Sequence, residues 1–204
     1  DLAYIRKSGM EAAIQKLVVK GTVLFGICGG YQMLGKAIYD PHNVESKQKE
    51  ICGLGYLAME TTFASEKLTA QVEAECIKLP LKDGIINAKN IAGYEIHMGK
   101  SSFAATVKHP FVVKGEALPQ REMFDGAYST YGQGEIIGTY IHGVFDNDDF
   151  RRQVLNELRA VKGLTKLPVQ INIKMQKERA YNNLAEVVRT NFDMEKLTKI
   201  MGAK

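Results

Sequence analysis

The feature that most constrains the fold is a cysteine placed at a sharp turn between a strand and a helix. An apolar run from Thr22 to Phe25 is followed at once by Gly26-Ile27-Cys28-Gly29-Gly30. Glycines two residues before and two residues after the cysteine let the chain reverse at a strained position, as in the Gly-x-Ser-x-Gly nucleophile turn. The pattern therefore predicts a strand that ends at Cys28 and a helix that begins directly after it.

The thiol of Cys28 is a candidate nucleophile. A helix N-terminus carries partial positive charge and free backbone N–H groups, and both favour the thiolate over the thiol. The same N–H groups can stabilise an oxyanion. The alternative is a cysteine that only fills space in an ordinary strand-to-helix turn, since free cysteine is often a small core residue.

The surrounding patterns predict an α/β domain with a mainly parallel, flavodoxin-like sheet flanked by helices. Met10 to Leu17 has the apolar spacing of a helix that ends before the strand Thr22 to Ile27. A second helix is predicted over Met33 to Ile38, and Asp40-Pro41 ends it. Alternation from Leu68 to Cys76 predicts a half-exposed strand with Cys76 in the core. Further strands are predicted at Ala92–His97, Phe111–Lys114 and Glu135–Ile141.

The C-terminal part of the chain reads as helical. Acidic residues at 146–149 begin a helix that runs to Val161, and two more are predicted from about Lys177 to Asn191 and around Leu197 to Met201. We therefore divide the chain into a core at residues 1–162 and a helical extension at residues 163–204 that packs on it.

Composition excludes several classes of protein. Of 204 residues, 45% are hydrophobic and 25% are charged, as in ordinary soluble domains, and no apolar run approaches the ~18 residues of a membrane helix. The net charge of +4 comes from residues 162–204, where nine basic residues spread along amphipathic helices suit a solvated or docking face and not nucleic acid. Three cysteines without a Cys-x-x-Cys pair predict neither disulfides nor a metal site. We expect a cytoplasmic protein without membrane contact.

A nucleophilic thiol needs a base, and His142 is the first candidate among four histidines. It follows the predicted strand 135–141, and if that strand is parallel to Thr22–Ile27, His142 and Cys28 emerge at the same edge of the sheet. His97, also at a strand end, is the second candidate. The alternatives are a strand-end histidine with satisfied hydrogen bonds for His142, and a structural hydrogen-bonded pair for Glu95 and His97.

Four segments together resemble the class I glutamine amidotransferases, and among them the cobyric acid synthase branch. They are Gly26-Ile-Cys-Gly-Gly-Tyr-Gln-Met-Leu-Gly35, Gly93-Tyr-Glu-Ile-His-Met-Gly99, Asp125-Gly-Ala127 and Gly138-Thr-Tyr-Ile-His-Gly-Val-Phe-Asp-Asn147. The first segment alone would specify only the class, and the combination narrows the resemblance to the branch.

The resemblance implies a function and a site. Cys28 attacks the side-chain amide of glutamine, the N–H of Gly29 holds the oxyanion, and His142 gives a proton to the departing ammonia. Gln32 matches a position that contacts substrate glutamine. The ammonia passes to an N-terminal synthetase domain of the same polypeptide, which holds ATP and magnesium and amidates adenosylcobyrinic acid a,c-diamide in cobalamin synthesis. This part of the chain should itself bind no nucleotide and no metal.

The chain departs from the class pattern at the third member of the triad. Most class I enzymes have a glutamate two residues after the histidine, where this chain has Val144, so Glu95 or Asp146 is the candidate orienting acid. The first strand and its oxyanion loop are also expected to lie outside this sequence, and the fragment could be weak or inactive. The alternatives are an amidotransferase domain for another acceptor, such as cobyrinic acid or a cell-wall lipid precursor, and a non-catalytic docking module.

Overall fold

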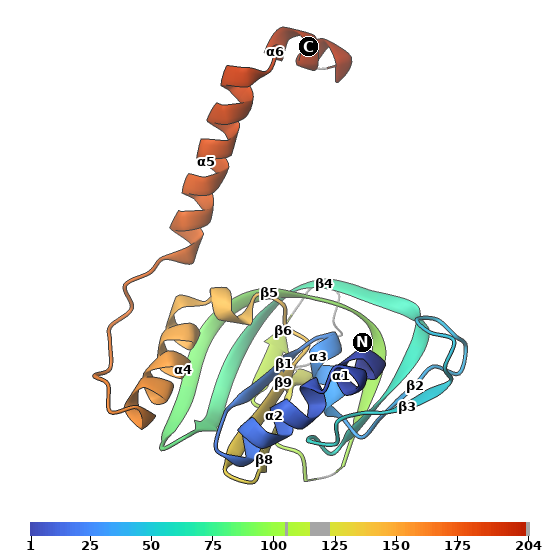
Figure 1. Cartoon of the computed structure of the whole chain (residues 1–204). Helices are drawn as coiled ribbons and strands as arrows, with labels where there is room; N and C mark the ends of the chain where they lie inside the picture. Colours follow the sequence, from blue (N-terminus) through green and yellow to red (C-terminus); the bar gives the residue numbers. More distant parts are fainter. Residues whose placement is uncertain (105, 115–122, 203–204) are drawn as a thin grey trace. The chain divides into compact units, whose positions relative to one another are not determined.

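The computed structural model describes residues 1–104, 106–114 and 123–202, which form two compact units, Asp1–Leu167 and Pro168–Lys204 (Figure 1). The helices of the first unit are α1 (Leu2–Lys7), α2 (Met10–Val19), α3 (Gly29–Leu34), the short η1 (Val144–Asp146) and α4 (Asp148–Val161). Its strands are β1 (Leu24–Ile27), β2 (Ala37–Tyr39), β3 (Glu50–Cys52), β4 (Met59–Leu81), β5 (Gly84–Phe103), β6 (Phe111–Lys114), β7 (Met123–Asp125), β8 (Ala127–Tyr131) and β9 (Gly134–Thr139). The second unit holds α5 (Ile173–Asn191) and α6 (Met194–Ile200).

The described strands of the first unit form two sheets, and the predicted α/β class is confirmed. One sheet has the order β1-β9-β8, and the other has the order β3-β2-β4-β6-β7 with β5 paired to β4. The sheets are mixed and not mainly parallel: β1 pairs β9 and β2 pairs β4 in parallel, and the other pairs are antiparallel. Short connections such as those of β4 to β5 and β8 to β9 force antiparallel pairing, because a parallel pair needs a long crossover.

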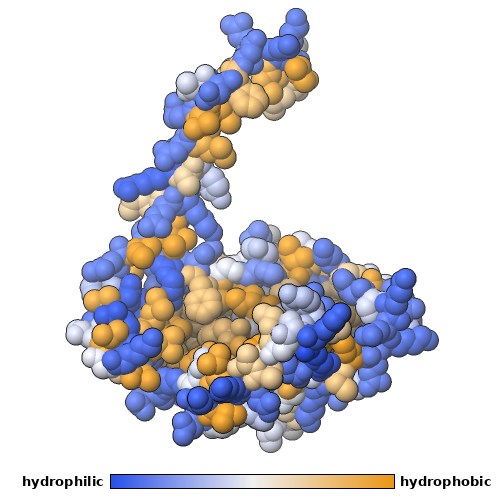
Figure 2. Space-filling view, viewed as in Figure 1, coloured by the Kyte–Doolittle hydropathy of each residue, from blue (hydrophilic) through white to orange (hydrophobic). Residues whose placement is uncertain are grey.

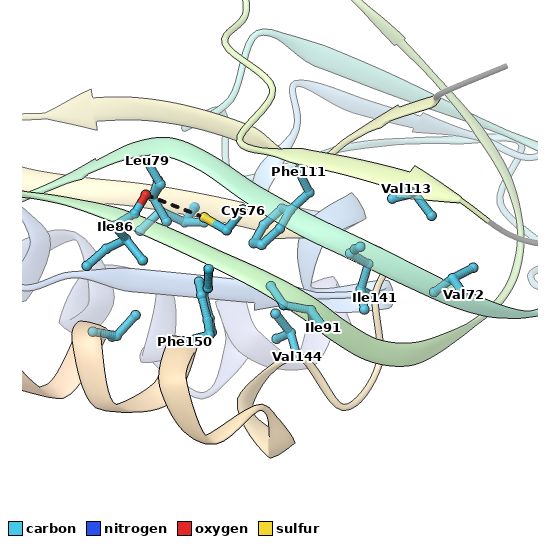
Figure 3. Close-up of a cluster of buried hydrophobic side chains, with 14 of the residues drawn as sticks. Val72, Cys76, Leu79, Ile86, Ile91, Phe111, Val113, Ile141, Val144 and Phe150 are labelled. Atoms are coloured by element: carbon cyan, nitrogen blue, oxygen red, sulfur yellow. Dashed lines mark hydrogen bonds between the residues drawn. The ribbon is translucent and has the colours of Figure 1, made fainter. Parts of the chain in front are cut away.

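The long β4–β5 hairpin supplies much of the core. Alternate residues of β4, from Ala70 to Cys76, are buried, as the period-two pattern predicts. Figure 3 shows Cys76 among Leu79, Ile86 and Phe111, with its thiol 3.9 Å from the carbonyl oxygen of Ile86. Burial raises the pKa of Cys76 to about 12, which keeps it a neutral thiol. The prediction that Cys76 is a core residue is confirmed.

The helix predicted over Met33 to Ile38 is wrong in its second half. Helix α3 ends at Leu34, and Gly35 turns the chain into an extended conformation. A Cβ at Gly35 would lie 2.8 Å from the carbonyl oxygen of Met59, so the chain passes very close to the start of β4. Residues 37–39 then pair in parallel with β4, and this tertiary pairing overrides the local helical spacing.

The second unit consists of helices without a buried side chain among its described residues. Helix α5 begins at Ile173, earlier than predicted, because Asn172 caps it by accepting a hydrogen bond from the N–H of Met175 at 2.9 Å. Hydrophobic residues gather along α5 and α6 (Figure 2), with Tyr181, Leu184 and Val188 among them. Packing of this unit on the core stays a prediction. Within the described ranges, no helix combines the length and the apolar content that crossing a membrane requires.

Candidate active site

Cys28 occupies the strained turn that the sequence predicts. Its backbone has φ 52° and ψ −115°, between the end of β1 at Ile27 and the start of α3 at Gly29. Gly26 is required sterically, since a Cβ there would lie 2.9 Å from the backbone of Gly30. A Cβ added at Gly30 would meet no atom within 4 Å, so the expectation that the turn requires a glycine at this position does not hold. A non-glycine residue at such a φ costs of order 1–3 kcal/mol and persists only where the surrounding structure holds it.

The sulfur of Cys28 is half-buried and lies 3.4 Å from the carbonyl oxygen of Ile96 in β5. Burial raises the pKa of the Cys28 thiol, and a hydrogen bond from the N–H of Gly29 lowers it by less. The N–H of Gly29 thus favours the thiolate, as expected, but burial of the sulfur outweighs this effect. Helix α3 has six residues, so its dipole is small, and the thiol needs a separate base to ionise.

His142 comes to the same region through the parallel pairing of β1 and β9. Ile27 is in register with Thr139, and the N–H of Cys28 donates to the carbonyl oxygen of Thr139 at 2.9 Å. Beyond β9, the N–H of His142 donates to the carbonyl oxygen of Tyr94 at 2.8 Å. The sulfur of Cys28 and the backbone of His142 thus contact β5 two residues apart.

The ring of His142 is held by packing and has a free nitrogen. It stacks on the ring of Tyr94 with centroids 4.8 Å apart and 2° between the planes. Its Nε2 atom is buried and has no hydrogen-bond partner among the described residues. Gly93 allows the backbone of His142 to lie this close to β5, because a Cβ at position 93 would lie 2.5 Å from the carbonyl oxygen of His142. A histidine kept only for structure would have that nitrogen satisfied, so the geometry favours a chemical role.

A cavity of about 560 Å³ opens beside Cys28 and is also lined by Gly29, Gln32 and His97. Its size is within the range of about 300–1,000 Å³ usual for small-molecule sites. Its described lining includes neither His142 nor Asp146. Asp146 lies in η1, where its N–H donates to the carbonyl oxygen of Gly143 at 2.8 Å.

Gln32 is fixed by a chain of hydrogen bonds behind the cavity. Its Nε2 donates to the hydroxyl of Tyr140 at 3.3 Å. The Tyr140 hydroxyl lies 2.6 Å from that of Ser101, which lies 3.1 Å from that of Thr61. With its nitrogen used in this way, the amide of Gln32 has its oxygen available as an acceptor. Cys28 and Gln32 share one cavity, as expected for residues one helical turn apart.

Glu95 and His97 form a pair with each other. Glu95 Oε2 lies 3.5 Å from His97 Nε2, and His97 Nδ1 lies 2.9 Å from the carbonyl oxygen of Gly99. The ring of His97 stacks on Tyr140 with centroids 3.9 Å apart. The geometry matches the structural alternative for this pair, although His97 also lines the cavity.

Sequence reasoning missed Tyr140 and Asp125. Tyr140 was assigned no role of its own in the sequence analysis, but its buried hydroxyl accepts a hydrogen bond from Gln32. Asp125 accepts hydrogen bonds from the Thr139 hydroxyl and from the N–H of Tyr140, and so fixes the segment that leads to His142. Burial raises the pKa of Asp125 to about 6, against the effect of the Thr139 hydrogen bond. The Asp125-Gly-Ala127 segment was the only signal for this role.

No group of three or more histidine, cysteine, aspartate or glutamate side chains in residues 1–104, 106–114 and 123–202 is placed to hold a metal ion.

A strained cysteine between a parallel strand and a helix, with a histidine from the neighbouring strand, is the arrangement of an α/β protein with a cysteine nucleophile turn. Residues 1–150 match the CobB/CobQ-like glutamine amidotransferase domain, and the chain belongs to that family.

Three curated relatives of the chain are all cobyric acid synthases. The chain is 44% identical to cobyric acid synthase of Clostridium botulinum (strain Kyoto / Type A2) over 204 residues, which are 100% of this chain and 39% of the relative. It is 43% identical to cobyric acid synthase of Streptococcus sanguinis (strain SK36) over 202 residues, which are 98% of this chain and 38% of the relative. It is 40% identical to cobyric acid synthase of Caldanaerobacter subterraneus subsp. tengcongensis over 203 residues, which are 98% of this chain and 39% of the relative. The chain thus spans well under half the length of these proteins.

Proposed function

We propose that this chain is a glutaminase unit that hydrolyses glutamine through a cysteinyl thioester and supplies ammonia to a synthetase domain. One observation carries the proposal: the sulfur of Cys28 and the backbone of His142 contact β5 two residues apart, and the Nε2 atom of His142 has no hydrogen-bond partner among the described residues. Membership of the glutamine amidotransferase family supports glutamine as the substrate.

The chemistry divides between the two side chains. His142 Nε2 takes the thiol proton, and the Cys28 sulfur attacks the side-chain carbonyl carbon of glutamine, while the N–H of Gly29 stabilises the oxyanion. The C–N bond then breaks, and ammonia leaves with the proton from His142. Water attacks the thioester, again with His142 as base, and releases glutamate and the thiol. Because burial raises the pKa of Cys28, we assign the removal of the thiol proton to a base, His142.

We infer that stacking on Tyr94, and not the carboxylate of Glu95, orients the imidazole. Glu95 is engaged with His97, whereas the Tyr94 ring is parallel to that of His142 and the two backbones are hydrogen-bonded. This arrangement would account for the presence of Val144 at the position where most of the class has a glutamate.

The acceptor of the ammonia is proposed from the relatives. They are cobyric acid synthases and are more than twice as long as this chain. We propose that an N-terminal synthetase domain, with bound ATP and magnesium, uses the ammonia to amidate adenosylcobyrinic acid a,c-diamide. An acceptor such as cobyrinic acid or a cell-wall lipid precursor is the alternative.

Covalent labelling tests the nucleophile. The chain is incubated with 6-diazo-5-oxo-L-norleucine, a glutamine-like electrophile, and the modified residue is found by mass spectrometry. We expect modification at Cys28 that is absent in Cys28→Ser. Equal labelling of Cys52 and Cys76 would contradict the proposal and favour a non-catalytic docking module.

Turnover tests the base. His142→Ala should lower glutamine hydrolysis more than tenfold, since positioned acid–base groups contribute ~10²–10⁴. His42→Ala, at an exposed loop histidine, is the matched control. Each variant is assayed with and without the rest of the full-length protein. Unchanged turnover in His142→Ala would remove this residue from the mechanism.

A further inference from the structure

Two side chains of opposite charge line the rim of the Cys28 cavity, and neither has a role in the chemistry above. Glu45 and Lys67 are both exposed, and Lys67 is the only lysine or arginine among the described lining residues. Glu45 is carried by a loop that hydrogen bonds hold to Asp40, and Lys67 by an irregular part of β4.

The loop that carries Glu45 is organised by a buried carboxylate. Asp40 accepts hydrogen bonds from three successive backbone N–H groups: Val44 at 2.7 Å, Glu45 at 2.9 Å and Ser46 at 2.8 Å. Asp40 is 2% exposed, and its oxygens are occupied by these bonds. Asp40 therefore shapes the loop, and Glu45 is the carboxylate that this loop presents to the cavity.

Lys67 lies on a large bulge in the β4–β5 pairing. Phe63 is opposite Gly99 and Leu68 is opposite His97, so residues 64–67 of β4 stand against Met98 alone. A bulge of this kind redirects side chains out of the regular ladder and is common beside active sites. Here it carries Lys67 to the rim of the Cys28 cavity and of a second cavity of about 550 Å³ that shares His97 and Met98 with the first.

We propose that Glu45 and Lys67 select the zwitterionic head of an L-α-amino acid, with Glu45 binding its α-ammonium group and Lys67 binding its α-carboxylate. This inference rests on the proposed function, because it assigns the recognition of glutamine at that site. A carboxylate that lines the cavity can pair with the ammonium group of an amino acid, and a lysine that lines it can pair with the carboxylate. Charge-assisted hydrogen bonds are about twice as strong as neutral ones. The preference for the zwitterion over an analogue that lacks one of the two charges should therefore be large enough to measure.

Three electrophiles that differ only at the head group test the assignment on the full chain. They are 6-diazo-5-oxo-L-norleucine, its counterpart without the amino group and its α-carboxamide, and the measurement is the rate of Cys28 alkylation. We expect the chain to prefer the zwitterion about tenfold or more. Glu45→Gln should abolish the preference over the reagent without the amino group, and Lys67→Met the preference over the α-carboxamide. The controls Glu66→Gln and Lys100→Met, at residues that line only the second cavity, should keep both preferences.

The outcomes separate this inference from the proposed function. Selective labelling of Cys28 with preferences unchanged in Glu45→Gln and Lys67→Met would overturn the assignment and leave the glutaminase proposal standing. Loss of the amino-group preference in Asp1→Asn, and not in Glu45→Gln, would also overturn it, since Asp1 lines the same cavity. Absence of selective Cys28 labelling in the unmodified chain would overturn both. Iodoacetamide, which has no amino acid head, should react with the variants and the unmodified chain at rates within twofold.

Discussion

Because the backbone of Cys28 is strained, we expect Cys28→Gly to be more stable than Cys28→Ala, which is the reverse of the usual order for these two residues. Alanine retains the Cβ at φ 52° and ψ −115°, whereas glycine adopts this region freely. Release of the strain should stabilise the fold by about 1–3 kcal/mol, and the larger backbone entropy of glycine in the unfolded chain should offset about 0.5–1 kcal/mol of that. We therefore expect Cys28→Gly to be about 1 kcal/mol more stable than Cys28→Ala.

Thermal unfolding of the two variants measures this difference. For a domain of this size, 1 kcal/mol corresponds to a shift in Tm of about 2–4 °C. Both variants lack the sulfur, so lost thiol contacts cancel in the comparison. The matched control is Cys52, an exposed residue at the end of β3 with ordinary backbone, where glycine should be less stable than alanine. Equal or lower stability of Cys28→Gly would refute the argument that this turn is strained.

Three further predictions concern the segments around the site. Gly93→Ala should lower glutamine hydrolysis at least tenfold with an unchanged circular dichroism spectrum, because the new Cβ would displace the backbone of His142; full activity would contradict this reading. Tyr140→Phe should raise KM for glutamine severalfold with a smaller change in kcat, because the Gln32 amide loses its hydrogen-bond partner. Steady-state kinetics measure both constants, and an unchanged KM would mean that Tyr140 is not what holds Gln32. The folded-state pKa of Asp125, about 6, is above its unfolded value, so its contribution to stability is complete below about pH 4 and is lost as pH rises through 6. When the pH is lowered from 7 to 5, the free energy of unfolding should therefore rise by about 1 kcal/mol more in the unmodified chain than in Asp125→Asn. Urea unfolding at the two pH values measures this difference, and equal rises in both proteins would show that the pKa of Asp125 is not raised.

The parts of the site that depend on local chain geometry were predictable from sequence. The turn at Cys28 follows from glycine spacing within a few residues, and the strand before it from its apolar run. The placement of His142 at the same sheet edge required an assumption about parallel pairing, which the register of β1 with β9 confirms.

The parts that depend on distant partners were not predictable. Residues 37–39 have helical spacing but pair with β4, and nothing local to them indicates that partner. The stacking of Tyr94 on His142 and the hydrogen bond from Gln32 to Tyr140 join residues far apart in the chain. The effect of burial on the pKa of Cys28 was not visible in the sequence, because burial of the sulfur is a property of the folded state.

The parallel pairing of β1 with β9 also bears on when the protein becomes reactive during its synthesis. The β4–β5 hairpin joins neighbouring segments and can form early, whereas β1 must wait for a strand made more than a hundred residues later. A nascent chain that has left the ribosome only as far as β5 already carries Cys28 but does not yet carry His142. On the proposed mechanism, such an unfinished polypeptide would not hydrolyse glutamine, and ammonia release would begin only after β9 and His142 have been made.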